Sequence, residues 1–354
     1  MAERTIGLSN EFIIHPGETL KEVLEDRNYT QKELALRTGF SEKHISKVLS
    51  GESSISPSFA KQLEFVFNNI PSSFWNNLQR IYDEEMTEFE IQANITSEEK
   101  KVAKSFEEYL KVEEIKWSTE IDKVITLRRY MEVSNLINVD KLVHGNYRTH
   151  FDAKVDDYTK YGFNMYVMRS VEPIQTDTPL DTKGLKEAIP TLKNIMLGSI
   201  DHYVPSLQYE LKKYGVLFNL VKKIPKTKIK GYTTSNRKGQ AILIITDYGK
   251  YWHYFWFTLF HEIYHVINKD FLKKNLTDDA LDEIEKKANI FAEDILINPY
   301  AYEEFISKRE FDFESIHDFS TQQDINLDTL IGRLQKDKLM GHSDFTANFR
   351  KILL

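Results

Sequence analysis

The spacing of hydrophobic positions predicts that the first part of the chain consists of short amphipathic helices. Apolar residues recur there at helical intervals, and capping residues, glycines and prolines interrupt them. Five helices are expected, over residues 17–28, 30–38, 42–49, 57–67 and from 71 past 82. Thr30 and Ser41 are the expected N-caps, Glu33 is expected to complete a capping box with Thr30, and Gly39 is expected to end the second helix.

The pattern changes near residue 185, where runs typical of a β-sheet appear. Residues 216–224 and 240–246 are predicted strands, and the second is a continuous apolar run of the kind found in buried strands. Helices are expected on either side, over residues 185–214 (one or two helices), 251–269 and 281–297. This order of elements indicates an α+β domain.

An acid-rich stretch separates these two parts. Residues 83–120 hold twelve acidic residues and five lysines, with scattered apolar anchors such as Phe106, Tyr109 and Leu110, which is typical of an exposed helical connector. Residues 121–170 are also predicted to be helical. The expected fold is therefore mostly α with a C-terminal α+β domain, and the expected domains span residues 1–85, 86–182 and 183–354.

Composition narrows the class of protein. The 354 residues are 41% hydrophobic and 29% charged, as in an ordinary globular protein, and there is no cysteine to form a disulfide or a thiolate metal ligand. The longest apolar stretch, Tyr251 to Phe260, is ten residues long, too short to span a bilayer. The first twelve residues contain no apolar run of the signal-peptide type. We therefore expect a cytoplasmic protein without a membrane partner.

Residues 30–51 form a helix-turn-helix pattern, the geometry in which a second helix reads the major groove of DNA. The net charge of the chain is −7, so attraction to phosphates must be local; within residues 32–47 four basic residues stand against two acidic ones. Gln31, at the start of the first helix, is expected to contact a phosphate. The expected DNA-facing residues of the turn and second helix are Ser41, Lys43, His44, Ser46 and Lys47.

The segment HPGETLKEVLEDRNYTQKELALRTGFSEKHISKVLSGESSISPSFAKQLEFVF resembles the Xre-type repressor domain. It is similar in particular to the HigA-like antitoxin branch, which opens with the motif found here at His15-Pro16-Gly17-Glu18. This resemblance covers about residues 12–85 and implies a five-helix DNA-binding domain, a double-stranded DNA operator and a cognate toxin as partner. Because such domains bind paired half-sites, a homodimer is expected.

Residues 261–265 read His-Glu-Ile-Tyr-His, a pattern that predicts a metal site. Two histidines four positions apart share one helix face, so both imidazoles can meet one ion, and Glu262 can act as general base toward a water there. A third ligand is needed. The acids available on the next predicted helix are Glu283, Glu285 and Glu293; Asn289 shares a face with Glu285 and can accept the second N–H of His261.

The segments WFTLFHEIYHVIN and EKKANIFAEDILINP resemble the ImmA/IrrE family of metallopeptidases, and the match runs from about Leu185 to Gln335. The resemblance implies a zincin-like fold and a Zn²⁺ ion held by His261, His265 and Glu285, with Glu262 as the catalytic base. It also implies specific cleavage of a regulatory protein. Two positions depart from the family pattern: Tyr264 stands where glycine is usual, and Asn326-Leu327-Asp328 differs from the His-Pro-Gly of fused relatives.

The sequence therefore predicts a DNA-binding regulator or antitoxin that carries a zinc-dependent endopeptidase domain. The alternative is a HigA-like repressor whose zinc domain is structural or ligand-sensing, and a third hypothesis is a toxin-neutralising module without DNA contact. His253 is expected to pack or to form a hydrogen bond rather than to bind the metal, and His317 and Tyr232 are open candidates for stabilising an oxyanion. Strand 240–246 is expected to pair with an extended substrate if it lies at the sheet edge.

Overall fold

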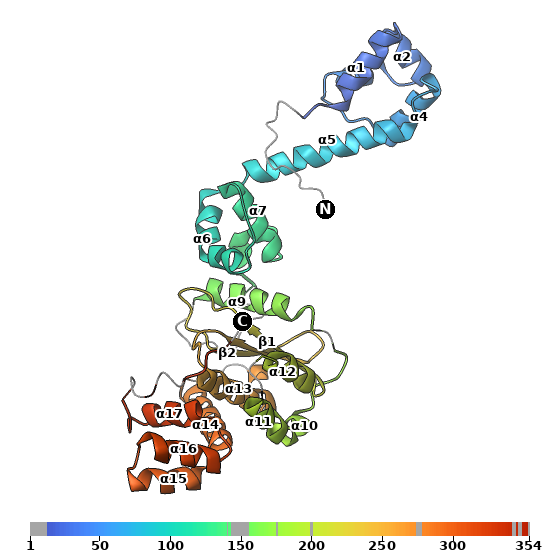
Figure 1. The fold of residues 1–354 in the computed structure, drawn as a ribbon. Coiled ribbons are helices and arrows are strands. Elements are labelled where there is room, and N and C mark those ends of the chain that lie inside the picture. Colours follow the sequence, from blue (N-terminus) through green and yellow to red (C-terminus); the bar gives the residue numbers. More distant parts are fainter. Residues whose placement is uncertain are drawn as a thin grey trace. The chain divides into compact units, whose positions relative to one another are not determined.

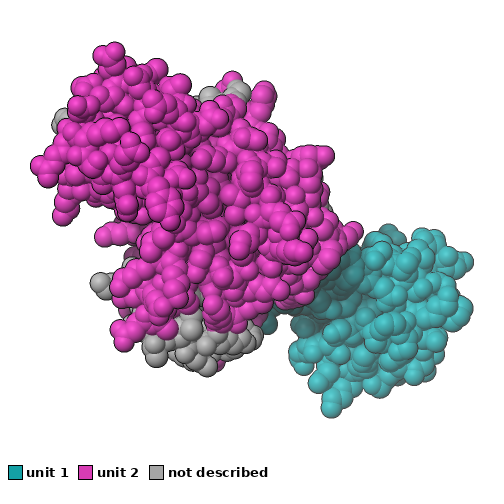
Figure 2. All heavy atoms as spheres, turned by 90° about the horizontal axis from the view of Figure 1, so that it is seen from below, with its two compact units in different colours: residues 1–100, 118–124 teal, residues 101–117, 125–354 magenta. Residues whose placement is uncertain are grey.

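The computed structural model describes residues 13–139, 141–142, 156–174, 176–198, 201–273, 278–341, 345 and 349–352. The first twelve residues and residues 143–155 of the predicted helical stretch 121–170 lie outside this part. The fold is mostly helical with one small sheet in the C-terminal region, as predicted (Figure 1). Contacts divide the chain into unit 1, residues 1–100 and 118–124, and unit 2, residues 101–117 and 125–354 (Figure 2).

Unit 1 contains the five predicted helices. They are α1 (Pro16–Asp26), α2 (Gln31–Thr38), α3 (Glu42–Leu49), α4 (Pro57–Val66) and α5 (Ser72–Ala93). All five contribute to one apolar core, in which Leu20, Leu34, Ile45, Phe59 and Trp75 are fully buried. Helices α2 and α3 with the turn between them form the predicted helix-turn-helix.

Local capping sets the ends of α2 and α3. The Thr30 hydroxyl accepts a hydrogen bond from the backbone N–H of Glu33 at 3.1 Å, and the Ser41 hydroxyl accepts one from His44 at 3.2 Å. Gly39 ends α2 in the left-handed conformation, with φ of 75°. The Glu33 carboxylate binds Arg37 instead of returning to Thr30, so only half of the expected capping box forms.

The motif at residues 15–17 ties the start of α1 to the end of α3. The His15 ring accepts a hydrogen bond from the backbone N–H of Gly17 through Nδ1, at 2.9 Å, and so caps the helix. A Cβ atom on Gly17 would stand 2.0 Å from the carbonyl oxygen of Val48. Glycine is required at this position because the two backbones meet there.

The acidic stretch is less exposed than the sequence suggested. Helices α6 (Ser97–Val112), α7 (Glu120–Tyr130) and α9 (Asp157–Val171), with the short 3₁₀ helix η2 (Leu136–Asn138), follow α5. Phe106, Tyr109 and Leu110 are buried, and the Tyr109 hydroxyl donates to the carbonyl oxygen of Thr159 in α9 at 3.0 Å. Of the acids of α6, Glu98 is exposed, Glu107 and Glu108 are half-buried and Glu99 is fully buried, while the apolar anchors pack in unit 2.

The sheet of unit 2 has the strand order β1-β3-β2, formed by β1 (Val216–Val221), β2 (Gly231–Ser235) and β3 (Ala241–Thr246). β1 runs parallel to β3 and β2 runs antiparallel to it. Strands β1 and β3 lie within the two predicted strands, but β2 was not expected. β3 pairs on both sides, so it does not lie at the sheet edge and the condition stated for its pairing with a substrate is not met. β2 is the edge strand beside the cavity described below.

Helices cover both faces of this sheet. α9 packs on one face through Phe163 and Tyr166, and α12 and α13 pack on the other (Figure 1). Before β1 stand three short helices, rather than one or two: α10 (Thr182–Glu187), α11 (Ile189–Leu197) and α12 (Tyr203–Lys212). After β3 come α13 (Trp252–Ile267), η3 (Asp270–Leu272), α14 (Asp278–Leu296), α15 (Pro299–Lys308), α16 (Phe313–Gln322) and α17 (Leu327–Lys336).

Helix α13 is the centre of unit 2. It contacts the sheet, α10, α14 and α17, which explains why it is apolar on nearly every face. Ala288 and Ala292 of α14 are fully buried, and small residues at such positions let two helices approach closely. Among the described residues, none of the helices has the length and apolar character needed to cross a membrane.

Candidate metal centre and nucleic-acid interface

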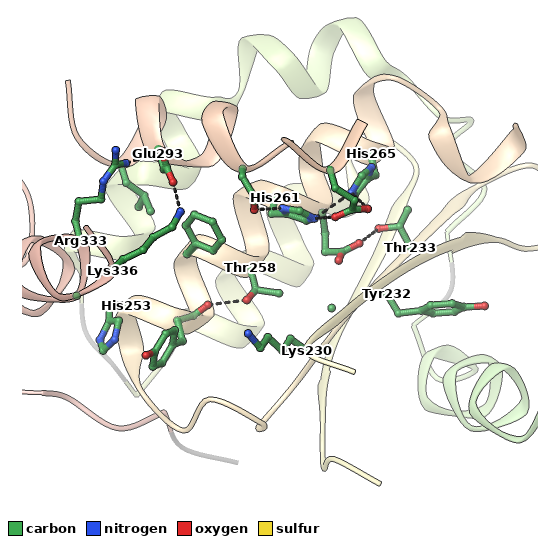
Figure 3. Close-up of a pocket in the computed structure, with 18 of the residues that line it drawn as sticks. Lys230, Tyr232, Thr233, His253, Thr258, His261, His265, Glu293, Arg333 and Lys336 are labelled. Atoms are coloured by element: carbon green, nitrogen blue, oxygen red, sulfur yellow. Dashed lines mark hydrogen bonds and ion pairs between the residues drawn. The ribbon is translucent and has the colours of Figure 1, made fainter. Parts of the chain in front are cut away.

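Helices α13 and α14 bring His261, His265 and Glu285 together on the wall of a cavity (Figure 3). The two histidine Nε2 atoms are 3.1 Å apart because one helical turn separates their residues. The carboxylate of Glu285 lies 3.1 Å from Nε2 of His261 and 3.5 Å from Nε2 of His265. Three ligand atoms thus converge from two helices.

The opposite ring nitrogens of both histidines are held by oxygen atoms. Nδ1 of His261 is 3.0 Å from Oδ1 of Asn289, the contact that the sequence suggested, and Nδ1 of His265 is 2.9 Å from Oδ2 of Asp270. Oxygen acceptors at these positions favour the tautomer with the proton on Nδ1, which leaves Nε2 free to bind a metal. The two rings are therefore oriented for coordination.

Asp270 makes the His265 side of the site strongly polar. Burial disfavours the charged form of His265, but the hydrogen bond to Asp270 and the nearby carboxylates of Glu262 and Glu285 outweigh it, so the pKa of His265 lies above its ordinary value. Burial also opposes the charge on Asp270, yet hydrogen bonds from His265 and Lys273 keep the pKa of this carboxyl below its usual range. Asp270 is 1% exposed, so its hydrogen bond with His265 is shielded from water.

This donor set fits a divalent metal ion. Two imidazole nitrogens bound to one tetrahedral zinc stand about 3.3 Å apart, close to the separation of the two Nε2 atoms. The other acids considered for the third ligand lie elsewhere: Glu283 pairs with Lys287 at 2.7 Å, and Glu293 pairs with Arg333 at 2.8 Å and with Lys336. Of the three acids, only Glu285 contacts the histidines in the described structure.

Glu262 lies beside the histidine pair and is held by the sheet. Its side chain is 7% exposed, and Oε2 accepts a hydrogen bond from the hydroxyl of Thr233 on β2 at 2.6 Å. Gly231, two residues earlier on β2, contacts the same carboxylate, since a Cβ there would stand 2.3 Å from Oε1. The expected general base is thus placed between α13 and the edge strand.

The cavity has a volume of about 920 Å³ and extends along α13 from the histidine pair toward α17. β2 and the preceding residues 228–230 form one wall, and α14 forms another. Phe257, Phe271 and Leu296 supply apolar lining, while Arg333 and Lys336 lie at the α17 end (Figure 3). A cleft of this size and mixed lining is typical of ligand-binding pockets.

The remaining sequence candidates do not reach the histidine pair. Tyr232 points to the opposite face of the sheet, where its hydroxyl donates to Asn164 of α9 at 3.3 Å (Figure 3). His317 lies exposed on α16, beside Asp318. His253 is 6% exposed, packs against Gly332 and the ring of Phe349, and makes no hydrogen bond with the described residues, as expected for a packing histidine.

Sequence reasoning missed two polar residues of this site. Asp270 follows His265 by five residues, beyond the end of the helix. The hydrophobic patterns that predict helices and strands do not mark it as a partner of that histidine. Thr233 lies on β2, which the hydrophobic pattern did not reveal, although Tyr232 and two consecutive threonines are residues that strands favour. Both contacts depend on elements folding back onto α13.

In unit 1, α2 and α3 present a polar face formed by most of the predicted DNA-binding residues. Lys43, Ser46 and Lys47 are exposed on α3, and Gln31 is exposed at the first position of α2. Neither lysine forms an ion pair with the described residues. By contrast, Arg37 of the same basic stretch is bound to Glu33 at 2.8 Å.

His44 and Ser41 differ from a simple outward-facing placement. The His44 ring stacks on Phe40 at a centroid distance of 4.8 Å and meets the ring of Phe59 edge-on at 5.2 Å, so it is half-buried rather than presented outward. These aromatic residues come from the turn and from α4, outside the helix whose periodicity suggested exposure. Ser41 is exposed, but its hydroxyl oxygen caps α3.

Comparison with known proteins supports this assignment of unit 1. Residues 20–74 match the family model described as helix-turn-helix. The chain thus carries the domain of a DNA-binding transcriptional regulator, from α1 into α5. No curated protein matches the sequence.

Proposed function

We propose that the chain is a DNA-binding regulator, similar to HigA-like antitoxins, whose unit 2 is a zinc-dependent endopeptidase that cleaves a specific regulatory protein. The observation that carries the peptidase proposal is the convergence of His261, His265 and Glu285 next to the buried Glu262. The resemblance of α13 and α14 to the ImmA/IrrE family supports zinc as the metal. The proposal depends on all of these groups together: two oriented imidazoles, a carboxylate and an adjacent base.

The residues divide the chemical work as follows. His261, His265 and Glu285 would hold zinc, which when bound polarises a peptide carbonyl and makes water more acidic. Glu262 accepts a proton from the attacking water and returns it to the leaving amine. Asn289 and Asp270 keep the two imidazoles in the tautomer that exposes Nε2.

The geometry of β2 favours a protein substrate. β2 is the edge strand of the sheet and lines the cavity beside Glu262, so an extended segment can add to the sheet there. Backbone pairing recognises extended shape more than sequence, so we expect specificity to come from side-chain pockets and from docking of a folded partner. The chain should then leave casein intact and cut one cognate regulator.

The DNA target is proposed to be a palindromic operator bound by a homodimer. A single helix such as α3 covers little of the major groove, and two half-sites one turn apart raise the affinity. The exposed Lys43 and Lys47 supply local positive charge on a chain with a net charge of −7. This arrangement confines DNA binding to one face of unit 1.

Metal analysis tests the ligand set. We expect one zinc per chain and near-complete loss of zinc in His265→Ala and Glu285→Ala. Glu283→Ala is the matched control, because Glu283 lies two residues away on α14 and pairs with Lys287 instead. Loss of zinc in Glu283→Ala but not in Glu285→Ala would refute the ligand assignment.

Cleavage assays with Glu262→Gln test the peptidase. Glutamine keeps the size of the side chain but cannot take a proton from water, so this variant should keep its zinc and lose cleavage of candidate regulators encoded nearby. Equal cleavage by both proteins would mean that Glu262 is not the base. If the zinc-loaded wild-type chain cuts no candidate, the result favours the alternative, a repressor whose zinc domain is structural or senses a ligand.

A further inference from the structure

Strand β2 meets Glu262 through two residues on the same face. Side chains alternate along a strand, so positions 231 and 233 both face α13, while Tyr232 and Thr234 face the α9 side. Thr233 is 5% exposed and its hydroxyl is 2.6 Å from Oε2 of Glu262. Gly231 brings bare backbone against Oε1 of the same carboxylate.

These two contacts treat the carboxylate oxygens differently. Oε2 receives the only hydrogen bond that the side chain of Glu262 makes with the described residues, and it comes from Thr233. Oε1 lies where the side chain of any other residue at position 231 would stand, and a Cβ there would also come within 2.7 Å of Cγ2 of Thr258. One oxygen is therefore fixed by a hydroxyl, and the other occupies the space that a side chain at position 231 would take.

We propose that Thr233 is the positioning residue of the proposed general base and that Gly231 makes room for Oε1 of Glu262, the oxygen that takes the proton. The inference rests on the proposed peptidase function. As the oxygen of water bonds to the peptide carbonyl carbon, an O–H bond of water breaks and an O–H bond forms at Oε1 of Glu262, while Oε2 stays bound to Thr233. The C–N bond then breaks and the proton passes from Oε1 to the leaving nitrogen, which restores the carboxylate.

The arrangement also explains why a hydroxyl is needed at position 233. A buried carboxylate loses its hydrogen bonds to water, and without a protein donor this loss is not compensated. Its side chain is then expected to rotate toward other donors. A short bond from a rigid, β-branched residue in the middle of a strand removes this freedom. Thr233 is paired in register with Leu243 of the central strand, so its own position is fixed by the sheet.

The test compares three variants of the full chain: Thr233→Val, Thr233→Ser and Thr234→Val. Valine keeps the shape of threonine without the hydroxyl, and serine restores the hydroxyl alone. Thr234→Val is the matched control, because the same change is made one residue away on the opposite face of β2. Zinc content and thermal unfolding establish that each variant is folded and loaded.

Crystal structures of these variants give a readout that does not depend on cleavage. We expect the Glu262 carboxylate to stay in one position in Thr233→Ser and Thr234→Val, and to move or occupy several positions in Thr233→Val. Gly231→Ala should displace the same carboxylate, because the added Cβ overlaps Oε1. An unmoved carboxylate in Thr233→Val would overturn the proposal, whether or not the chain is a peptidase.

Kinetics with a cleaved regulator give the second readout. We expect kcat of Thr233→Val to fall about 10- to 100-fold with KM unchanged, less than the roughly 10²- to 10⁴-fold that a general base contributes, because Glu262 itself is still present. Thr233→Ser should recover kcat to within about threefold of wild type, in line with the modest cost of one altered hydrogen bond. A fall in Thr233→Ser as large as in Thr233→Val would mean that packing, not the hydroxyl, matters at this position. Absence of cleavage by the zinc-loaded wild-type chain would favour the repressor alternative over the peptidase function, and the crystal structures would still decide whether Thr233 fixes the Glu262 carboxylate.

Discussion

His253 and His265 lie on the same helix, yet their surroundings move their pKa values in opposite directions. Burial lowers the pKa of His253 to about 4, although the carboxylate of Asp328 acts in the other direction. His265 is also buried, but its hydrogen bond to Asp270 and the nearby glutamates keep its pKa above the ordinary value. At the residue scale, the presence of one bonded carboxylate separates a packing histidine from a candidate ligand.

The low pKa of His253 predicts that acid destabilises unit 2. An unfolded histidine titrates near pH 6.5, so between pH 6.5 and 4 the unfolded chain binds a proton that the folded chain excludes. The neutral His253 therefore contributes to the free energy of unfolding in full above pH 6.5. This contribution, about 3 kcal/mol, is lost as the pH falls toward 4. Urea unfolding of the metal-free chain should therefore show a weaker pH dependence in His253→Leu than in wild type.

The exposed His317→Gln serves as the control for removing one histidine. In this variant, the difference in the free energy of unfolding between pH 6.5 and pH 4 should be the same as in wild type. The same pH dependence in His253→Leu and in wild type would contradict the burial argument.

At the scale of secondary-structure elements, the position of each functional helix is set by the elements packed against it. α3 is held by α1 and α2 and by the aromatic residues around His44, whereas α13 is held by the sheet, α14 and α17. β2 is the least expected of these elements, and it carries the contact to Glu262. η3, next to β2, carries the contact to His265.

The placement of α3 predicts how DNA binding responds to charge removal. Lys43→Ala combined with Lys47→Ala should abolish the gel shift of the promoter fragment at physiological salt, because both cations lie exposed on the proposed reading helix. If both lysines contact phosphates, the slope of log K against log salt should fall by about 2. Binding is measured by titration at several salt concentrations.

A double variant elsewhere in unit 1 removes the same charge. Lys61→Ala with Arg80→Ala takes two cations from α4 and α5, where each is paired with a glutamate. This control should bind DNA nearly as wild type does. A gel shift that survives Lys43→Ala with Lys47→Ala unaltered would show that α3 does not read the operator.

At the scale of the whole molecule, the two candidate sites belong to separate units. The core of α1 to α5 is complete within residues 20–75, and every residue of the candidate metal centre lies in unit 2. The chain therefore combines a DNA-binding unit with a unit of different chemistry.

This division predicts that the two activities are separable. His265→Ala should lose zinc and keep the gel shift, and Lys43→Ala with Lys47→Ala should lose the gel shift and keep both zinc and cleavage. Both properties are measured on the same preparations, with far-UV circular dichroism as the check on folding. If removal of zinc from the wild-type chain abolishes DNA binding, the units are coupled and the prediction fails.

The sequence by itself determined the features that arise within a few residues. The ends of α2 follow from Thr30 and Gly39 and the start of α3 follows from Ser41, because each cap bonds to a backbone group three or four positions away. The convergence of His261 and His265 follows from the helical repeat alone. The helix-turn-helix and the mostly helical fold with a small sheet were also predicted, because hydrophobic spacing and capping residues are local features of the sequence.

Only the tertiary structure decided which distant groups meet. It brought Glu285 to the histidines while Glu283 and Glu293 found cationic partners, and it placed Asp270 and Thr233 against the site. It also put β3 in the middle of the sheet, and packed His44 among aromatic rings. These outcomes depend on how elements far apart in the chain pack around α13 and α3, a competition between many contacts that no local pattern of residues specifies.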